Sequence, residues 1–222
     1  MTGNTPKICA AITSDDLDTI DDVAPLVDMF EVRIDLIGKR WRRVAAYLKK
    51  PWIACNRRAD EGGKWNGKES PRVKELRDAV ELGATIIDIE LVTPSLADLV
   101  NEVKDRAECL ISYHNLKETP PLDKLRQIVV NQLAAGAGIC KVITTARSFA
   151  DNLVVLQLIT DFSSANIISF AMGVKGQLSR VLCPLAGGYF TYASVGKGKE
   201  SAEGQIAVKD LREVYRMLAH DR

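Results

Sequence analysis

The chain lacks the sequence features of secreted and membrane proteins. Its five cysteines, Cys9, Cys55, Cys109, Cys140 and Cys183, are odd in number and include no Cys-x-x-Cys pair, which argues against a disulfide framework or a zinc cluster. No apolar run is long enough for a signal peptide or a membrane span. We therefore expect a soluble, cytoplasmic protein without a membrane partner.

An excess of charge of one sign is also missing. The 30 Lys and Arg residues face 29 Asp and Glu residues, so a net charge of +1 gives no long-range attraction to nucleic acid. The segments 61–63 and 196–198 lack the spacing of a dinucleotide fingerprint or a P-loop. With two histidines, His114 and His220, and no cluster of ligands, a catalytic zinc would lack donors. We expect no nucleic acid partner, no cofactor and no metal.

Short β-rich apolar runs alternate with amphipathic helical segments along the whole chain. This alternation is typical of parallel βα units. The predicted strands are 8–12, 29–35, 52–56, 86–91, 109–114, 140–144, 167–172 and 189–193. The predicted helices are 18–27, 41–49, 70–82, 95–106, 122–135, 148–161, 177–183 and 208–218, and Gly83 and Gly136 are expected to stop two of them. Eight units of each kind favour an α/β fold of the (β/α)8 TIM barrel class.

The chain shows no long linker between these units. At 222 residues it lies within the range of one barrel, so we expect a single catalytic domain over residues 1–222. The glycine-rich stretch 196–204 is the one segment expected to form a mobile loop.

Charged residues occupy several predicted strands. Alternation places Glu31, Arg33 and Asp35 on one face of their strand, and it pairs Asp88 with Glu90 and Ser112 with His114 in the same way. In this architecture, polar residues late in several strands meet at the carboxyl-end mouth, where active sites lie. Solvated strand ends or a buried network of ion pairs would explain Glu31, Arg33 and Asp88 equally well.

Lys141 and His114 are the strongest candidates for chemistry. Lys141 lies in the apolar run 138–143, where burial would lower its pKa and yield a neutral, nucleophilic amine. A lysine that extends from the strand end into water is the alternative. His114 ends a strand, where a general acid/base is useful near neutral pH. His220 is expected to lie in a solvated tail.

Several motifs in fixed order resemble the type I 3-dehydroquinate dehydratase family. Phe30-Glu-Val-Arg-Ile-Asp35 is similar to its second-strand motif, which implies that Glu31 and Arg33 line the substrate site. Asn56-Arg-Arg-Ala-Asp-Glu-Gly-Gly63 resembles the arginine and turn after its third strand, which favours Arg57 over Arg58 as the site arginine. Ser112-Tyr-His-Asn115 resembles the histidine motif, and Lys141-Val-Ile143 falls where the family has its Schiff-base lysine.

The resemblance implies roles for further residues. The glutamate that orients His114 is Glu61 in the turn or Glu90 in Ile87-Asp-Ile-Glu-Leu91. Met172 forms a pocket wall, Arg180 binds the substrate carboxylate, and Ser201 and Gln205 of Ser201-Ala-Glu-Gly-Gln205 contact substrate from a closing loop. Two positions depart from the family pattern: Glu203 stands where a proline is common, and Phe170 where a second methionine is common.

The function implied by the resemblance is reversible dehydration of 3-dehydroquinate to 3-dehydroshikimate. Lys141 would carry a Schiff base and His114 would move protons, in the shikimate pathway of aromatic amino-acid biosynthesis. A homodimer is also implied. The alternatives are a class I Schiff-base aldolase, which would need a phosphate site near the last two strands, and a barrel that binds a metabolite without catalysis.

Overall fold

Parallel strands form the centre of the molecule. The computed structural model describes residues 5–219 of the chain. In that range the strands are β1 (Ile8–Ile12), β2 (Met29–Arg33), β3 (Trp52–Cys55), β4 (Ile86–Glu90), β5 (Glu108–His114), β6 (Ile139–Thr145), β7 (Ile167–Met172) and β8 (Thr191–Ser194). Nearly all their residues are buried, as expected for parallel strands covered on both faces.

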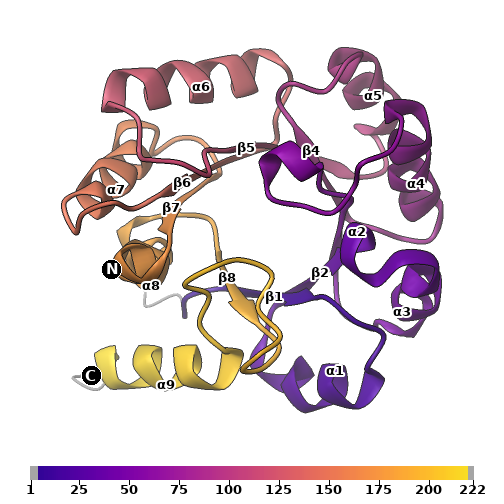
Figure 1. Cartoon of the computed structure of the whole chain (residues 1–222), viewed down its shortest axis with the longest axis horizontal. Helices are drawn as coiled ribbons and strands as arrows, with labels where there is room; N and C mark the ends of the chain where they lie inside the picture. Colours follow the sequence, from indigo (N-terminus) through magenta and orange to yellow (C-terminus); the bar gives the residue numbers. More distant parts are fainter. Residues whose placement is uncertain (1–4, 220–222) are drawn as a thin grey trace.

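The strands follow one another around a nearly closed barrel (Figure 1). Their order over residues 5–219 is β7-β6-β5-β4-β3-β2-β1-β8, and all neighbouring pairs are parallel. Where the two ends of this order meet, the amide of Tyr189 donates a hydrogen bond of 2.7 Å to the carbonyl of Ile167. The predicted (β/α)8 TIM barrel is confirmed.

Helices surround the strands on the outside of the barrel (Figure 1). They are α1 (Leu17–Val23), α2 (Ile34–Ile37), α3 (Trp41–Tyr47), α4 (Glu69–Glu81), α5 (Leu96–Val103), α6 (Leu122–Ala134), α7 (Asp151–Asp161), α8 (Gln177–Leu182) and α9 (Val208–Leu218). Short 3-10 turns lie at Ala24–Leu26, Gly38–Arg40, Ala59–Glu61, Val174–Gly176 and Pro184–Ala186. Gly83 and Gly136 follow α4 and α6 with φ of 92° and 89°, which confirms them as helix stops.

The strands divide their side chains between two layers of core. Outward residues such as Val32, Ile87 and Ile111 pack with helix residues that include Trp41 and Leu76. Inward residues fill the barrel interior, among them Cys9, Ile53, Leu110, Ile139, Ile168 and Tyr192. They belong to a second cluster that also contains outward residues of β6 and β7, such as Val142 and Ile167, packed against α6 and α7. Alternation along each strand therefore leaves a solid barrel interior beneath the mouth.

Two predicted boundaries are wrong for identifiable reasons. The second strand was predicted to reach residue 35, but β2 ends at Arg33 and Asp35 lies in α2, so Asp35 does not share the strand face of Glu31. The first helix was predicted to run to residue 27, but it ends at Val23, and a 3-10 turn that contains Pro25 follows it. The remaining elements agree with the prediction to within a few residues at each end.

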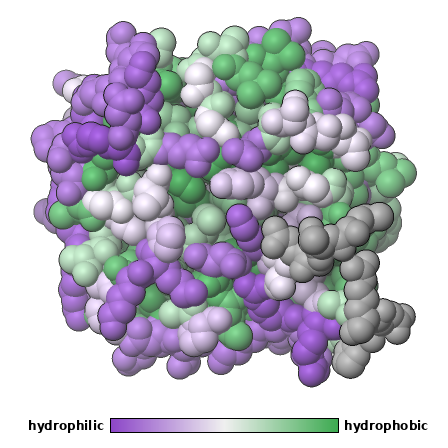
Figure 2. Space-filling model, turned by 180° about the vertical axis from the view of Figure 1, so that it is seen from behind, coloured by the Kyte–Doolittle hydropathy of each residue, from purple (hydrophilic) through white to green (hydrophobic). Residues whose placement is uncertain are grey.

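Polar and apolar residues are interspersed on the face of the molecule seen in Figure 2. Across residues 5–219, no helix is both long enough and apolar enough to cross a membrane.

Candidate active site

The carboxyl ends of the strands open into one pocket. Ten predicted site residues line it: Glu31, Arg33, Arg57, Glu61, His114, Lys141, Met172, Arg180, Ser201 and Gln205. They come from β2, the turn after β3, β5, β6, β7, α8 and the loop after β8, so the barrel brings together side chains that are far apart in sequence. Glu90 and Arg58 are not among the lining residues, and His220 lies outside the described residues.

Lys141 is buried inside the barrel with only 5% of its surface exposed, so the alternative that it extends into water is wrong. Its Nζ donates to Asp88 Oδ2 at 2.8 Å and to Glu31 Oε1 at 3.4 Å. Burial lowers the pKa of Lys141, but the two carboxylates outweigh this effect and leave the pKa above its ordinary value. The expected lowering of the pKa is therefore wrong, because β2 and β4 supply anions that the apolar run 138–143 does not reveal.

His114 lies at the end of β5 against Glu61. Its Nδ1 is 2.9 Å from Glu61 Oε2, and its backbone amide donates to the same oxygen at 3.1 Å. Burial and the Arg57 and Lys141 cations lower the pKa of His114 well below its ordinary value, so the ring is neutral. A carboxylate at Nδ1 favours the tautomer with hydrogen on that nitrogen, which leaves Nε2 free to accept a proton.

Glu61, and not Glu90, is the glutamate beside His114. Glu90 accepts hydrogen bonds from Arg72 at 2.6 Å and from the amide of Arg58 at 3.1 Å, and it pairs with Arg57 at 3.0 Å. Glu90 therefore belongs to a buried network of charged residues behind the pocket, together with Arg72 and Arg57.

Arg57 connects this charged network to the pocket. Its guanidinium lies 2.6 Å from Asp88 Oδ2 and donates to Ser112 Oγ at 2.6 Å. The neighbouring Arg58 is partly exposed and pairs with Asp60 at 2.8 Å. Of the two arginines, the geometry thus places Arg57 in the site, with most of its donors committed to protein acceptors.

Arg180 is a buried cation that forms no ion pair with any residue in the range 5–219. It is 2% exposed, its guanidinium stacks over the ring of Phe170 at 4.3 Å, and its Nε has no hydrogen-bond partner within residues 5–219. Burial lowers its pKa to about 10. A desolvated guanidinium that faces a pocket is suited to bind a carboxylate at two points.

The loop after β8 lies over the pocket. Gln205 Oε1 accepts hydrogen bonds from the backbone amide of Ser201 at 2.7 Å and from its hydroxyl at 3.2 Å, so the two predicted contact residues hold each other. Lys199 Nζ, earlier in the loop, donates to Asp16 Oδ2 at 2.6 Å. Arg33, at the end of β2, is held by two bonds to Asp35 of 2.9 and 2.8 Å.

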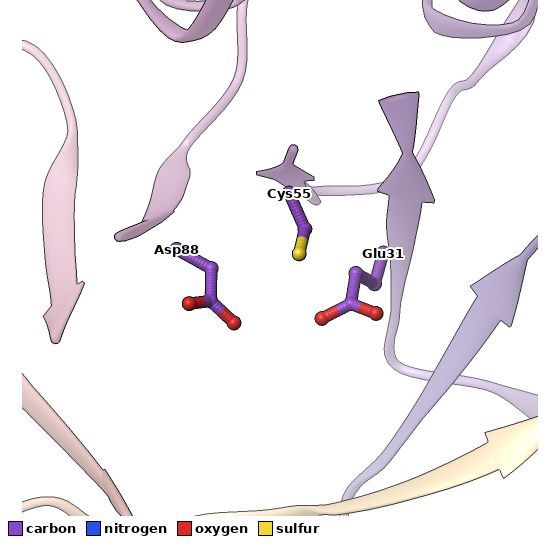
Figure 3. A group of neighbouring side chains, drawn as sticks. All are labelled: Glu31, Cys55 and Asp88. Atoms are coloured by element: carbon purple, nitrogen blue, oxygen red, sulfur yellow. The ribbon is translucent and has the colours of Figure 1, made fainter. Parts of the chain in front are cut away.

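Glu31, Cys55 and Asp88 point toward one another inside the barrel (Figure 3). Such a group has the donor types of a metal site, but its carboxylates already contact the Lys141 ammonium, and Asp88 also contacts Arg57. Although burial opposes it, the two cations lower the pKa of Asp88 well below its ordinary value. The cluster thus acts as the counter-anion of Lys141 and Arg57.

The sequence and the fold have known relatives. The profile described as type I 3-dehydroquinase matches residues 8–222. The chain belongs to the type I 3-dehydroquinase family. A 3-dehydroquinate dehydratase of Dehalococcoides mccartyi is 41% identical over 96% of both chains, and one of Methanocaldococcus jannaschii is 33% identical over 95% of this chain and 98% of its own. The crystal structure of 3-dehydroquinate dehydratase from Geobacillus kaustophilus superposes with a TM-score of 0.86, at 25% identity over 99% of this chain and 94% of that one.

Family membership confirms the resemblance expected from the motifs and favours a dehydratase over the aldolase and the non-catalytic barrel. Two residues beside the type I 3-dehydroquinase site were missed by sequence reasoning. Arg72 is fully buried yet lies in an ordinary amphipathic segment, α4. Tyr192, whose ring faces Lys141 Nζ at 4.2 Å, is an aromatic residue in an apolar strand and carries no distinguishing signal.

The pKa of Glu61 predicts how activity changes with pH. Burial raises this pKa to about 7, with Glu90 and Asp88 adding to the effect and Arg57 opposing it. Below that pH, Glu61 gains a proton and no longer favours the tautomer with a free Nε2, so kcat/KM of the wild type should fall as the pH drops. Glu61→Gln should lose this limb and be slower by about 10²-fold at neutral pH, as measured in pH–rate profiles.

Glu108→Gln is the matched control. Burial also raises the pKa of Glu108, but this residue does not line the pocket, so the variant should keep the wild-type profile. A Glu61→Gln enzyme with unchanged rate and unchanged limb would exclude tautomer control by Glu61.

Proposed function

We propose that this enzyme dehydrates 3-dehydroquinate reversibly to 3-dehydroshikimate through a Schiff base on Lys141. The observation that carries the proposal is a buried lysine and a glutamate-linked neutral histidine lining one pocket of a type I 3-dehydroquinase. The reaction is a β-elimination from a β-hydroxy ketone, and its obstacle is the weak acidity of the C–H next to the carbonyl. An iminium at that carbonyl withdraws the electrons that the departing proton leaves behind.

Lys141 must lose a proton before it attacks. Its ammonium is stabilised by Asp88 and Glu31, so the neutral amine forms only when another base accepts that proton. Neutral His114 is available as this base, and it would return the proton to the carbonyl oxygen, which leaves as water when the iminium forms. Neutral again, His114 would then remove the proton next to the iminium and deliver it to the departing hydroxyl. Glu61 would orient the imidazole throughout. The lysine itself provides the electron sink, so the mechanism calls for no cofactor.

The remaining pocket residues would hold the substrate in register. Arg180 is suited to the carboxylate because its buried guanidinium has no ion pair with another residue in the range 5–219. The ring and its hydroxyls would be contacted by Glu31, Arg33, Arg57, Met172, Ser201 and Gln205. Holding reacting groups in register lowers a barrier by several kcal/mol, up to about 7–11 in favourable systems.

The biological setting is proposed from the same activity. The enzyme would serve the shikimate pathway of aromatic amino-acid biosynthesis in the cytoplasm, as a single catalytic domain that spans residues 1–222. The relatives named above share this chain's length, since each is covered over more than nine-tenths.

Borohydride tests the Schiff base. Reduction in the presence of 3-dehydroquinate should leave a stable adduct on the peptide that carries Lys141, located by mass spectrometry. Lys141→Ala should form no adduct and lose turnover by about 10³-fold or more, because the electron sink is gone. Lys74→Ala, which removes a lysine with 71% side-chain exposure, is the control and should behave as wild type. An adduct on another peptide would contradict the assignment, and the absence of enone absorbance with wild-type protein would contradict the function.

Arg180→Lys tests the carboxylate contact. Lysine keeps the charge but cannot form the planar two-point bond, so KM should rise by about tenfold with kcat changed far less. Arg126→Lys is the control, because Arg126 pairs with Asp161 and Asp123 on the surface, away from the pocket. Equal KM values in Arg180→Lys and the wild type would remove Arg180 from substrate binding.

We also propose that the enzyme is a homodimer, which the family resemblance implies. Light scattering after size-exclusion chromatography should then give a mass about twice the 24.4 kDa of the chain. A mass of one chain across micromolar concentrations would contradict the dimer.

A further inference from the structure

Tyr192 has a buried hydroxyl without a hydrogen-bond partner. It lies on the inward face of β8, is 4% exposed, and its Oη has no partner in the described range 5–219. Buried hydroxyls normally have partners, because leaving one unpaired destabilises the fold. Tyr215 shows the usual arrangement, with its hydroxyl donating to the carbonyl of Val181 at 2.9 Å. The unpaired hydroxyl of Tyr192 therefore calls for an explanation from the chemistry of the pocket.

The surroundings of Tyr192 are those of the reacting amine. Its ring faces Lys141 Nζ at 4.2 Å, and the rings of Phe170 and Phe190 hold it at centroid distances of 6.4 and 5.4 Å. Burial raises the pKa of Tyr192, and the charge of Glu31 raises it further, so the phenol stays protonated and can donate. Glu31 Oε1 contacts the same amine as the ring does, at 3.4 Å from Lys141 Nζ. The ring is thus fixed beside an ammonium whose own acceptors are Asp88 and Glu31.

Formation of the Schiff base changes the number of N–H donors on Lys141 Nζ. An ammonium and a ketone give an iminium and one water, with the positive charge retained and two N–H protons leaving in the water. Lysine has three N–H donors as an ammonium, but its iminium has one. The shorter bond, to Asp88 at 2.8 Å, can persist, while Glu31 Oε1, at 3.4 Å, loses its donor. A buried carboxylate oxygen that loses a donor destabilises the intermediate.

We propose that the Tyr192 hydroxyl is a positioning group that donates to Glu31 Oε1 once Lys141 has become an iminium. The proposal rests on the Schiff-base function above. This hydrogen bond would give the hydroxyl a partner in the iminium intermediate. It would also hold the Glu31 carboxylate in place and leave its other oxygen free to contact the substrate.

Tyr192→Phe tests this directly, because it removes the hydroxyl and keeps the ring over the amine. With 3-dehydroquinate as substrate, kcat should fall by about tenfold, the size expected for one hydrogen bond to a charged group, while KM changes by less than about twofold. The fraction of enzyme trapped by borohydride at saturating substrate should fall as well. The melting temperature should equal or exceed that of the wild type, because an unpaired buried hydroxyl has been removed.

Tyr215→Phe is the matched control. It removes a paired hydroxyl away from the pocket, so the melting temperature should fall while kcat and the trapped fraction stay at wild-type values. A purely structural role for the Tyr192 hydroxyl would make Tyr192→Phe behave in the same way.

Three outcomes would overturn the proposal. They are wild-type turnover in Tyr192→Phe, a loss of stability without a loss of turnover, and slower turnover with an unchanged trapped fraction, which would place the hydroxyl at a later step. Each presupposes a wild-type enzyme that dehydrates 3-dehydroquinate and is trapped on Lys141. Failure of the wild type in those two assays would instead reject the proposed function.

Discussion

The buried ion pair between Lys141 and Asp88 is the interaction on which the rest of the site depends. Asp88 Oδ2 lies 2.8 Å from Lys141 Nζ and 2.6 Å from Arg57, Arg57 lies 3.0 Å from Glu90, and Glu90 lies 2.6 Å from Arg72. Each charge in this series is compensated by the next. Removing one member would leave a buried charge unpaired, at a cost of about 3–5 kcal/mol, so the amine is held in place by β6, β4, the turn after β3 and α4 together.

The charged groups of the pocket differ in whether they have a partner of opposite charge within residues 5–219. Lys141 has its anions, and His114 has Glu61. Arg180 lacks an anion among residues 5–219, and Phe170 offers only the face of its ring. A ligand with a carboxylate is therefore favoured at that end of the pocket, because it completes the coordination of a desolvated cation. If that ligand also carries a ketone, the ketone would lie toward Lys141, which must lose a proton before it attacks the carbonyl carbon.

The sequence predicted the parts of the site that depend on one strand at a time. Alternation put Glu31 and Arg33 on one face of β2, and motif order singled out His114 and Lys141. It gave the wrong pKa direction for Lys141, because the deciding anions are 53 and 110 residues away and become neighbours only when the barrel forms. The sequence also left open whether Glu61 or Glu90 lies beside His114, because their distances to His114 are fixed only when the barrel forms.

Phe170, which stands where the family commonly has a methionine, lies on β7, and the end of this strand has two structural roles. Phe170 supports the Arg180 guanidinium, and three residues later the amide of Gly173 donates to the carbonyl of Glu203 at 3.2 Å, which docks the loop after β8. The approach is close: a Cβ on Gly204 would lie 2.4 Å from the Gly173 carbonyl, and φ there is +75°, so this position requires glycine. The end of β7 thus contacts both the Arg180 guanidinium and the loop that carries Ser201 and Gln205. Because both contacts share that strand end, a shift of β7 would move the Arg180 guanidinium and the loop together.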